Sequence, residues 1–422
     1  MDYDVLILGG GVIGCATAYE LSKYNLNIAL IEKEHDIAND IAFVDVSLVY
    51  KGILSHSEEM ANLQIKGNDI ITELVNTFDI VYKESILDII NIDNSGNNNM
   101  NNKALIISPY DLALAFGEIA YDNGVNFRLE EKSVKVDRIN DGFRVTTNKA
   151  KFTCRKIINT TSKNYEYEKE FSNNKISTGH IKYLLMEKSY KKYRDKAVIK
   201  FIGDEILYLI PSPEGNLIIG LKSVKNISYE DMVDKIRIWG IDFNEDDIKD
   251  FFQYNYFDDV LKGYNNLEQN YIKVVGKNFT EATLAPAIAN KIAENIRQNI
   301  GCTKKSYFNE SRRESYKFRF LSNIERNKLI HIDKKFGKII CTCNLVTEAE
   351  IVDAIRRPLG ARTVEAIIRR TGAGNGQCRG CGCYNKIVSI LARETNKKMT
   401  SIVKNTSESN VILNRIKEFD SI

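Results

Sequence analysis

The sequence lacks three features that would set it apart from ordinary globular proteins. No stretch of its 422 residues approaches the roughly 18 consecutive apolar residues that a membrane span needs. Its 59 basic and 56 acidic residues nearly cancel, so the charge balance gives no case for a nucleic-acid partner or a membrane surface. The start, MDYDVLILGG, carries no basic segment ahead of an apolar run. We therefore expect a cytoplasmic globular protein of roughly two or three domains.

Histidine is also scarce, and its spacing is typical of neither a metal site nor a catalytic site. Each histidine is interpreted as a surface or hydrogen-bonded residue. No general base can be nominated, and residues 170–270 contain no cluster of arginines suited to bind a phosphate. The catalytic residues therefore stay unassigned at this stage. The four histidines are His35, His56, His180 and His331.

The first informative feature is a glycine-rich turn near the N-terminus. A short apolar run, DVLIL, precedes GGGVIG, and a segment with helical periodicity follows, which predicts a strand, a turn and a helix. Gly9, Gly11 and Gly14 occupy the three glycine places of a dinucleotide motif. A second apolar run ends at Glu32, whose carboxylate can accept hydrogen bonds from both hydroxyls of an adenosine ribose. The pattern predicts binding of an adenine dinucleotide, either FAD or NAD.

The second feature is a concentration of cysteines near the other end of the chain, where five of the eight lie. Because cytoplasmic thiols stay reduced, clustered cysteines there are metal ligands more often than disulfides. The first pair has the spacing Cys-x-Cys, which is not a typical zinc knuckle, so an iron–sulfur centre is favoured over zinc and over unliganded thiols. The scattered Cys15, Cys154 and Cys302 are interpreted as small buried residues. The five clustered cysteines are Cys341, Cys343, Cys378, Cys381 and Cys383.

The segments between these motifs predict structure more than chemistry. A helix is expected from Ser108-Pro109 to Asn123-Gly124. The two apolar runs of EILYLIPSPEGNLIIGL flank a turn, which predicts a second sheet of the kind that covers a bound cofactor. The Asn-rich NIDNSGNNNMNN is predicted to be a solvated loop.

Short helices are predicted around the clustered cysteines. TEAE, from Thr347 to Glu350, is a capping box, TVEAIIRR precedes a glycine-rich turn, and NKIVSILARE follows the last cysteine. The arginines of this region could offset the negative charge of a thiolate-bound cluster, although an arginine-rich helical face is more often simply solvated. These arginines are Arg356, Arg357, Arg362, Arg369, Arg370 and Arg379.

Together these motifs resemble the flavin-dependent, glycerol-3-phosphate dehydrogenase-like oxidoreductases of the D-amino-acid-oxidase superfamily that carry a C-terminal domain like bacterioferritin-associated ferredoxin. The resemblance implies an α/β Rossmann-like FAD-binding domain with an inserted mixed or antiparallel substrate sheet, and a small all-α domain with a [2Fe-2S] cluster. The implied boundaries are 1–330 for the oxidoreductase domain, with the substrate sheet within about 170–270, then 338–395 for the cluster domain and 396–422 for a tail. The resemblance to this family rests on five segments of the sequence: DVLILGGGVIGCATAYELSKYNLNIALIEKE, ISPYDLALAFGEIAYDNGVNFRLEE, LAPAIANKIAENI, KFGKIICTCNLVTEAEIVDAI and RRTGAGNGQCRGCGC.

The resemblance also assigns residues to FAD. It implies that Gly9, Gly11 and Gly14 face the pyrophosphate, that Glu32 binds the ribose, and that Val136 lies at the adenine.

For the cluster, the resemblance implies Cys341, Cys343 and Cys378 as ligands. The fourth ligand is Cys383 by the Cys-x4-Cys spacing of the fused dehydrogenases. The alternative is Cys381, by the Cys-x2-Cys spacing of the stand-alone ferredoxin.

The implied activity is that of an FAD-dependent dehydrogenase. It would oxidise a small hydroxy or amino compound similar to glycerol 3-phosphate and pass electrons through the [2Fe-2S] centre to an acceptor protein or partner subunit. The sequence departs from the flavin-contacting pattern of the family at Asp40–Ala42, Ser162 and Glu281. These departures leave open a catalytically degenerate subunit that serves as scaffold or electron relay. A third hypothesis gives the glycine turn to NAD or the thiols to structural zinc.

Overall fold

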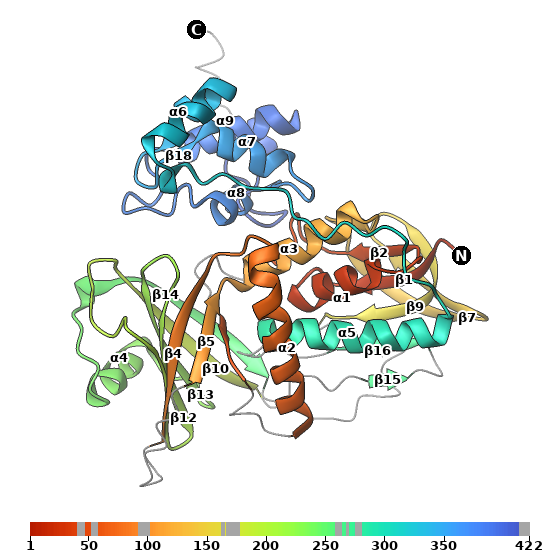
Figure 1. The fold of residues 1–422 in the computed structure, drawn as a ribbon, viewed down its shortest axis with the longest axis horizontal. Coiled ribbons are helices and arrows are strands. Elements are labelled where there is room, and N and C mark those ends of the chain that lie inside the picture. Colours follow the sequence, from red (N-terminus) through yellow and green to blue (C-terminus); the bar gives the residue numbers. More distant parts are fainter. Residues whose placement is uncertain are drawn as a thin grey trace.

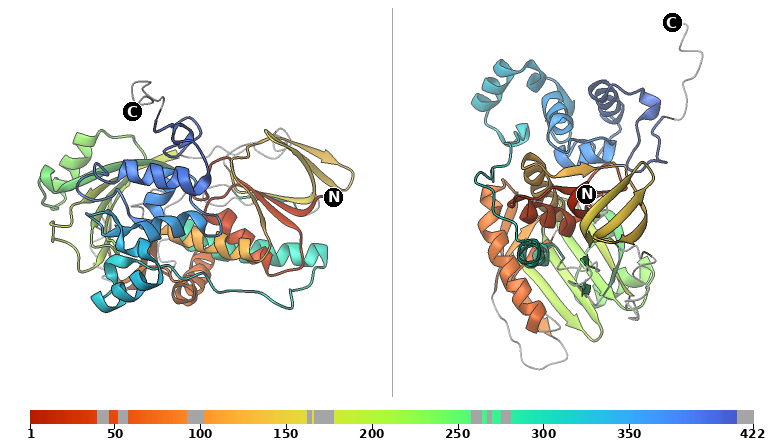
Figure 2. Two further views of the ribbon diagram at one scale, coloured as in Figure 1. Left: turned by 90° about the horizontal axis from the view of Figure 1, so that it is seen from above. Right: turned by 90° about the vertical axis from the view of Figure 1, so that its right-hand side faces the viewer.

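The structure is a computed structural model in which the chain forms a large N-terminal domain with two sheets and a small helical C-terminal domain (Figure 1). The N-terminal domain extends through the last helix that packs on the first sheet, and the C-terminal domain lies on one side of it, at the top of the right-hand view of Figure 2. The structure describes residues 1–39, 47–51, 58–91, 102–161, 165, 178–257, 264–266, 270–274 and 281–412.

The first sheet has a parallel centre that is buried on both faces. Its strands run in the order β15-β16-β9-β1-β2-β6, and β7 and β8 form a ribbon that continues from β9. Val5 and Ile7 share one hydrophobic cluster with the helices, whereas Leu6 and Leu8 share another with the β7–β8 ribbon, because successive side chains of a strand point to opposite faces. The strands are β1 (Tyr3–Leu8), β2 (Ile28–Ile31), β6 (Asn126–Arg128), β7 (Ser133–Ile139), β8 (Gly142–Thr147), β9 (Lys151–Asn159), β15 (Tyr264–Asn266) and β16 (Tyr271–Lys273).

Four helices belong to the helical side of this sheet. Every residue of α1 is buried, since α3 and α5 pack against it, and this explains why its sequence is apolar or small nearly all round. Helix α2 crosses α5 and extends toward the second sheet (Figure 1). The four are α1 (Val12–Ser22), α2 (Glu58–Thr77), α3 (Pro109–Asp122) and α5 (Glu281–Ile300).

The second sheet is mixed and has the order β14-β10-β13-β12-β11-β4-β5-β3. All of its neighbours are antiparallel except β11 and β4, which are parallel. Helix α4 (Tyr229–Ile238) covers one face. The expected substrate sheet is present, and it also includes β3–β5, which precede the range assigned from the sequence. Its strands are β3 (Ser47–Val49), β4 (Tyr82–Asn91), β5 (Asn102–Ile107), β10 (Thr178–Met186), β11 (Ala197–Ile202), β12 (Glu205–Pro211), β13 (Leu217–Ser223) and β14 (Ile248–Phe257).

The C-terminal domain is a small helical frame with its own hydrophobic core. The predicted capping box is present: Glu350 donates its amide to the Thr347 hydroxyl over 3.3 Å, and the Thr347 amide donates to the Glu350 carboxylate over 2.7 Å. Residues 402 and 403 of the expected tail pack into the same core or against it. A two-stranded hairpin, β17 and β18, adds to the expected all-helical domain. The elements are α6 (Asn323–Ile332), β17 (Ile339–Cys341), β18 (Val346–Thr347), α7 (Glu348–Arg356), α8 (Val364–Thr371) and α9 (Tyr384–Thr395).

The elements predicted between the two motifs are confirmed. Ser108 caps α3 by accepting the Asp111 amide at 3.3 Å, with Pro109 as its first residue. Strands β12 and β13 form the predicted hairpin. Residues 92–101 of the Asn-rich segment lie outside the described residues. Within the described ranges, no helix combines the length and hydropathy that crossing a bilayer requires.

The crossing of α2 and α5 generates a test of the packing. A Cβ atom on Gly67 would lie 1.8 Å from the Thr283 carbonyl oxygen, so the two helices cross too closely for any side chain. Replacing glycine by alanine inside a helix normally stabilises a protein by about 0.5–1 kcal/mol. We expect Gly67→Ala instead to lower the free energy of unfolding by about 1–3 kcal/mol, because the backbone of α5 must move.

Denaturant unfolding measures this change, and Glu73→Ala on the exposed face of the same helix is the matched control. The control should shift the free energy of unfolding by less than about 0.5 kcal/mol. A Gly67→Ala protein as stable as the parent would show that the helices do not cross at this point.

Candidate functional site

The glycine turn joins β1 to α1 and leaves a space for a ligand. Gly9 has φ +104°, which favours glycine, and a Cβ atom on Gly14 would lie 2.0 Å from the Gly9 carbonyl oxygen. Gly11 differs, because its φ of −70° suits any residue and the described residues place no atom within 4 Å of its Cβ position. Neither the backbone nor the packing of the described chain requires glycine at 11. A ligand that approaches the backbone at the N-terminus of α1 does require it, as a pyrophosphate would.

Glu32 lies beside this turn, directly after β2. Its carboxylate accepts the Gly10 amide at 2.6 Å and the Glu34 amide at 3.0 Å. These two contacts orient a half-buried carboxylate beside the glycine turn. The geometry fits the predicted role at a ribose.

Val136 completes the group of residues predicted for FAD. It lies on β7, is 5% exposed, and shares a hydrophobic cluster with Leu8 and Ile31, the last residues of β1 and β2. Gly9, Gly11, Gly14 and Glu32 therefore lie at the carboxyl ends of β1 and β2, and Val136 on β7 shares a hydrophobic cluster with the last residues of these strands. Of the departures noted in the sequence, Asp40–Ala42 and Ser162 lie outside the described residues. Glu281 is the first residue of α5.

The clustered cysteines lie on two loops that meet in the C-terminal domain. A Cβ atom on Gly376 would lie 2.4 Å from Cβ of Cys343, so glycine at 376 permits this contact. The Asn344 side chain donates to the Gly372 carbonyl over 2.7 Å and ties the same loops together. Cys341 and Cys383 are buried, whereas Cys343, Cys378 and Cys381 are exposed.

Four of the five thiols are close enough to perturb one another. Burial, followed by the nearby thiols of Cys341, Cys378 and Cys343, raises the pKa of Cys383 to about 11. A hydrogen bond with Cys343 and the backbone amides of the loop lower the pKa of Cys378. In the part of the chain that the structure describes, Cys381 contributes a backbone amide to this network.

The donor set consists of thiols, whose thiolates are the usual ligands of iron–sulfur clusters. Among the described residues, no three Cys, His, Asp or Glu side chains form a group that could hold one metal ion. A binuclear cluster distributes four thiolates over two irons, and the glycines of the second loop allow the thiols to adjust to it. Cys341, Cys343, Cys378 and Cys383 would hold such a cluster.

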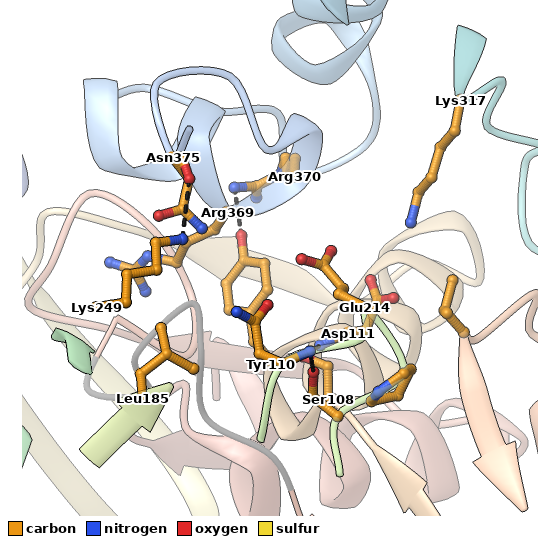
Figure 3. Close-up of a pocket in the computed structure, with 14 residues that line it drawn as sticks. Ser108, Tyr110, Asp111, Leu185, Glu214, Lys249, Lys317, Arg369, Arg370 and Asn375 are labelled. Carbon is orange, nitrogen blue, oxygen red and sulfur yellow. Dashed lines mark hydrogen bonds between the residues drawn. The ribbon is translucent and has the colours of Figure 1, made fainter. Parts of the chain in front are cut away.

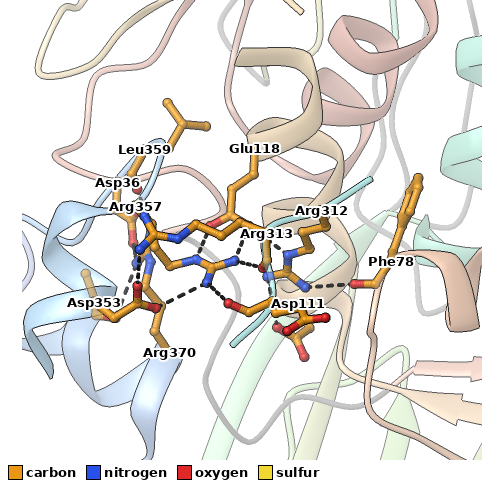
Figure 4. Close-up of polar contacts among 12 residues, drawn as sticks. Asp36, Phe78, Asp111, Glu118, Arg312, Arg313, Asp353, Arg357, Leu359 and Arg370 are labelled. Carbon is orange, nitrogen blue, oxygen red and sulfur yellow. Dashed lines mark hydrogen bonds and ion pairs between the residues drawn. The ribbon is translucent and has the colours of Figure 1, made fainter. Parts of the chain in front are cut away.

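Buried ion pairs join the two domains, as Figure 4 shows. The Arg357 Nε atom lies 3.2 Å from a Glu118 oxygen, and the Arg312 Nε atom lies 2.7 Å from the other. Arg370 binds Asp36 through both terminal nitrogens, at 2.6 and 2.7 Å. Burial opposes the charge of Arg370, but Asp36 outweighs it and raises the pKa of Arg370, so this arginine stays charged.

This arrangement corrects the interpretation of the arginines. The sequence suggested that they face solvent or offset the charge of a cluster. Arg357, Arg369 and Arg370 are instead buried at the domain junction, where they bind groups of the N-terminal domain. The sequence carried no signal for these contacts, because the partners lie hundreds of residues apart.

A cavity of about 80 Å³ lies between the second sheet and the C-terminal domain (Figure 3). Lys249 at its edge donates to the Asn375 carbonyl over 3.2 Å. Asn375 belongs to the glycine-rich loop that leads to Cys378, so the second sheet contacts the cysteine loops directly. Other basic side chains that line the cavity are Lys317, Arg369 and Arg370.

Comparisons with protein families identify both domains. Residues 4–89 match the FAD dependent oxidoreductase family, and residues 339–393 match the BFD-like [2Fe-2S] binding domain. The chain is 30% identical to a glycerol 3-phosphate dehydrogenase of Caloramator mitchellensis, with 97% of this chain and 98% of that protein covered.

Two solved structures share the fold. The glycerol-3-phosphate dehydrogenase from Bacillus halodurans, complexed with FAD, has a TM-score of 0.62 at 14% identity and covers 94% of this chain and 91% of its own. The L-alpha-glycerophosphate oxidase from Mycoplasma pneumoniae, with FAD bound, has a TM-score of 0.58 at 20% identity. The match covers 74% of this chain and 99% of the oxidase. The predicted FAD-binding fold with its second sheet is confirmed, as are both predicted cofactors, FAD and a [2Fe-2S] cluster, whereas the predicted all-α cluster domain also contains the β17–β18 hairpin.

The open space at Gly11 gives a direct test of the dinucleotide site. In the Gly11→Val protein the new side chain enters space that the described residues leave empty, so the chain should fold. The side chain blocks the approach of a pyrophosphate, and we expect the FAD content after purification to fall at least about tenfold, which corresponds to about 1.4 kcal/mol. The ratio of flavin to protein absorbance measures it.

Gly337→Val is the matched control, because this glycine lies in the C-terminal domain and its Cβ position has only ordinary contacts, with Ile330. The control should keep the FAD content of the parent. A folded Gly11→Val protein with the same ratio of flavin to protein absorbance as the parent would show that the dinucleotide binds elsewhere.

Proposed function

Because this chain belongs to the glycerol 3-phosphate dehydrogenase family, we propose that it oxidises glycerol 3-phosphate and passes the electrons through its [2Fe-2S] centre to an acceptor protein. The observation that carries the proposal is similarity along nearly the whole of both chains, over the oxidoreductase domain and the cysteine-rich domain alike. The chain is an FAD-dependent dehydrogenase. When bound, FAD accepts a hydride from a carbon beside a hydroxyl group, and the cluster carries single electrons.

The residues proposed to hold FAD act through backbone and carboxylate groups. Gly9 and Gly14 let α1 start directly against β1, which aims the free amides of its first turn at the phosphates. Gly11 leaves room for those phosphates. Glu32, oriented by two backbone amides, accepts the ribose hydroxyls, and Val136 provides an apolar contact at the adenine.

For the cluster, we propose Cys341, Cys343, Cys378 and Cys383 as ligands. The proposal is supported by the mutual contacts of these four thiols. Cys383 lies in the buried end of the group with Cys341, whereas Cys381 is exposed. Cys381 is the alternative, because Gly380 and Gly382 on either side of it leave the loop pliable.

Anaerobic reduction tests the activity. Adding glycerol 3-phosphate to the purified protein without oxygen should bleach the flavin absorption band and then produce the paramagnetic signal of a reduced [2Fe-2S] cluster. Glycerol, which lacks the phosphate, serves as the control substrate and should act much more weakly. A protein that contains both cofactors but is not bleached would contradict the proposal and support the catalytically degenerate alternative.

The choice of the fourth ligand is tested by two single substitutions. We expect Cys383→Ser to lose most of its iron and sulfide, because serine replaces a thiolate in the buried end of the site. Cys381→Ser should keep the iron and sulfide content of the parent. Both proteins are purified anaerobically and analysed for iron and acid-labile sulfide per chain. Loss in Cys381→Ser together with full content in Cys383→Ser would reverse the assignment.

The Cys383→Ser protein also tests the route of the electrons. Because its FAD site is intact, glycerol 3-phosphate should still bleach the flavin, while the cluster signal is absent and fewer electrons are taken up per chain. If the parent cluster is never reduced by substrate, electrons do not pass through it.

A further inference from the structure

Helix α8 touches the loops that carry the cysteines. It ends at Gly372, which adopts a left-handed conformation with φ 76°, and the loop that carries Cys378 begins there. The Gly372 carbonyl accepts the Asn344 side chain, one residue after Cys343. The C-terminal end of α8 therefore lies where both cysteine loops meet.

The same helix holds a segment of the dinucleotide site. Arg370 binds the Asp36 carboxylate through both terminal nitrogens, and Arg369 donates to the Ala38 carbonyl over 3.0 Å. The Ala38 amide in turn donates to the Gly10 carbonyl over 2.8 Å. Residues 33–39 directly follow Glu32 in the chain and contact the glycine turn through Ala38. Helix α8 therefore binds a segment that touches both parts of the predicted dinucleotide site.

The central ion pair is deeply buried. The side chains of Arg370 and Asp36 are 4% and 1% exposed. The Tyr110 hydroxyl lies 3.2 Å from the Asp36 carboxylate and accepts Arg370 over 2.6 Å, and Arg370 also donates to the Leu359 carbonyl over 2.8 Å. Because the ion pair is buried, water does not screen it. The hydrogen bonds of Arg370 and Asp36 hold the two side chains in one relative orientation. The position of Asp36 therefore depends on the position of α8.

A second ion pair joins the domains through helix α3. Arg357 binds Glu118, which lies within α3. Both pairs link a buried arginine of the C-terminal domain to a buried carboxylate of the N-terminal domain. Asp36 belongs to the segment whose Ala38 amide binds Gly10 of the glycine turn, whereas Glu118 belongs to α3, so the two pairs can be compared.

We propose that Asp36 and Arg370 couple the two cofactor sites, so that assembly of the cluster tightens FAD binding and bound FAD protects the cluster. Thiolate ligation orders the loops at the end of α8, as metal binding orders the segments that hold it. An ordered α8 fixes Arg369 and Arg370, and these fix residues 33–39 beside Glu32. By thermodynamic reciprocity, each cofactor must raise the affinity for the other by the same factor. Asp36 and Arg370 act as positioning residues, and the inference rests on the cofactor sites proposed above.

The test compares FAD affinity with and without the cluster. The full-length protein is prepared with its cluster and after anaerobic removal of iron by a chelator, and the dissociation constant of FAD is measured by titration in each form. We expect FAD to bind at least about fivefold more tightly to the parent with its cluster, the lower end of typical couplings between sites. In Asp36→Asn this ratio should fall to about 1, because the neutral amide loses the ion pair.

Glu118→Gln is the matched control, since it removes the other buried carboxylate from the same junction. It should lower the melting temperature as Asp36→Asn does, yet keep the coupling ratio of the parent. Arg370→Lys is a second variant, because lysine keeps the charge but cannot bind the carboxylate through two nitrogens, and its ratio should lie below that of the parent. Iron loss in the presence and absence of FAD measures the reciprocal effect.

Two results would overturn the coupling: a ratio near 1 in the parent, or an unchanged ratio in Asp36→Asn and Arg370→Lys. Equal loss of the ratio in Glu118→Gln would show that the whole junction matters and that this ion pair has no special role. These failures leave the proposed activity standing if glycerol 3-phosphate still bleaches the flavin. Absence of FAD binding in both forms of the parent would instead contradict the cofactor assignment itself.

Discussion

The relative position of the two domains depends on carboxylates buried at their junction. Glu118 and Asp36 are 2% and 1% exposed, and each is matched by arginine from the C-terminal domain. Removing one partner of a buried pair commonly costs about 3–5 kcal/mol, because the remaining charge has neither water nor a counter-ion. A pair of this kind stabilises little compared with apolar packing, but it strongly disfavours any other arrangement of the two surfaces. The cysteine loops and the glycine turn thereby hold a defined relation to each other.

The sequence predicted the features that depend on local patterns. The strand, turn and helix around Gly9, and the capped helices around the cysteines, follow from periodicity and from residues that start or stop elements, and the structure contains them. The glycine turn and Glu32 lie together because they follow β1 and β2, and the carboxyl ends of neighbouring parallel strands meet at the same edge of a sheet. Local signals of this kind survive in a single sequence.

The features that escaped prediction depend on contacts distant in the chain. Asp36 and Arg370 are separated by 334 positions, and no spacing rule connects them. The arginines of the C-terminal domain were predicted to face solvent. Helical periodicity shows which residues share a face of a helix, but it does not show which other part of the protein packs on that face. Strands β3–β5 joined the second sheet from outside the assigned range for the same reason. Spacing favoured Cys383 over Cys381 as the fourth ligand but could not show that the Cys383 thiol is buried and the Cys381 thiol exposed, because burial depends on how the loops pack.

The junction also bears on how freely such modules can be exchanged between proteins. Consider a cluster domain from another protein that has its own cysteines and helices but lacks arginines at the places of 357, 369 and 370. Docked in the same place, it would bury Glu118 and Asp36 with fewer opposite charges, although Arg312 of the linker would still reach Glu118. The two carboxylates thus favour a C-terminal domain that carries arginines in matching places. A chimaera built from these parts would need both surfaces transferred together.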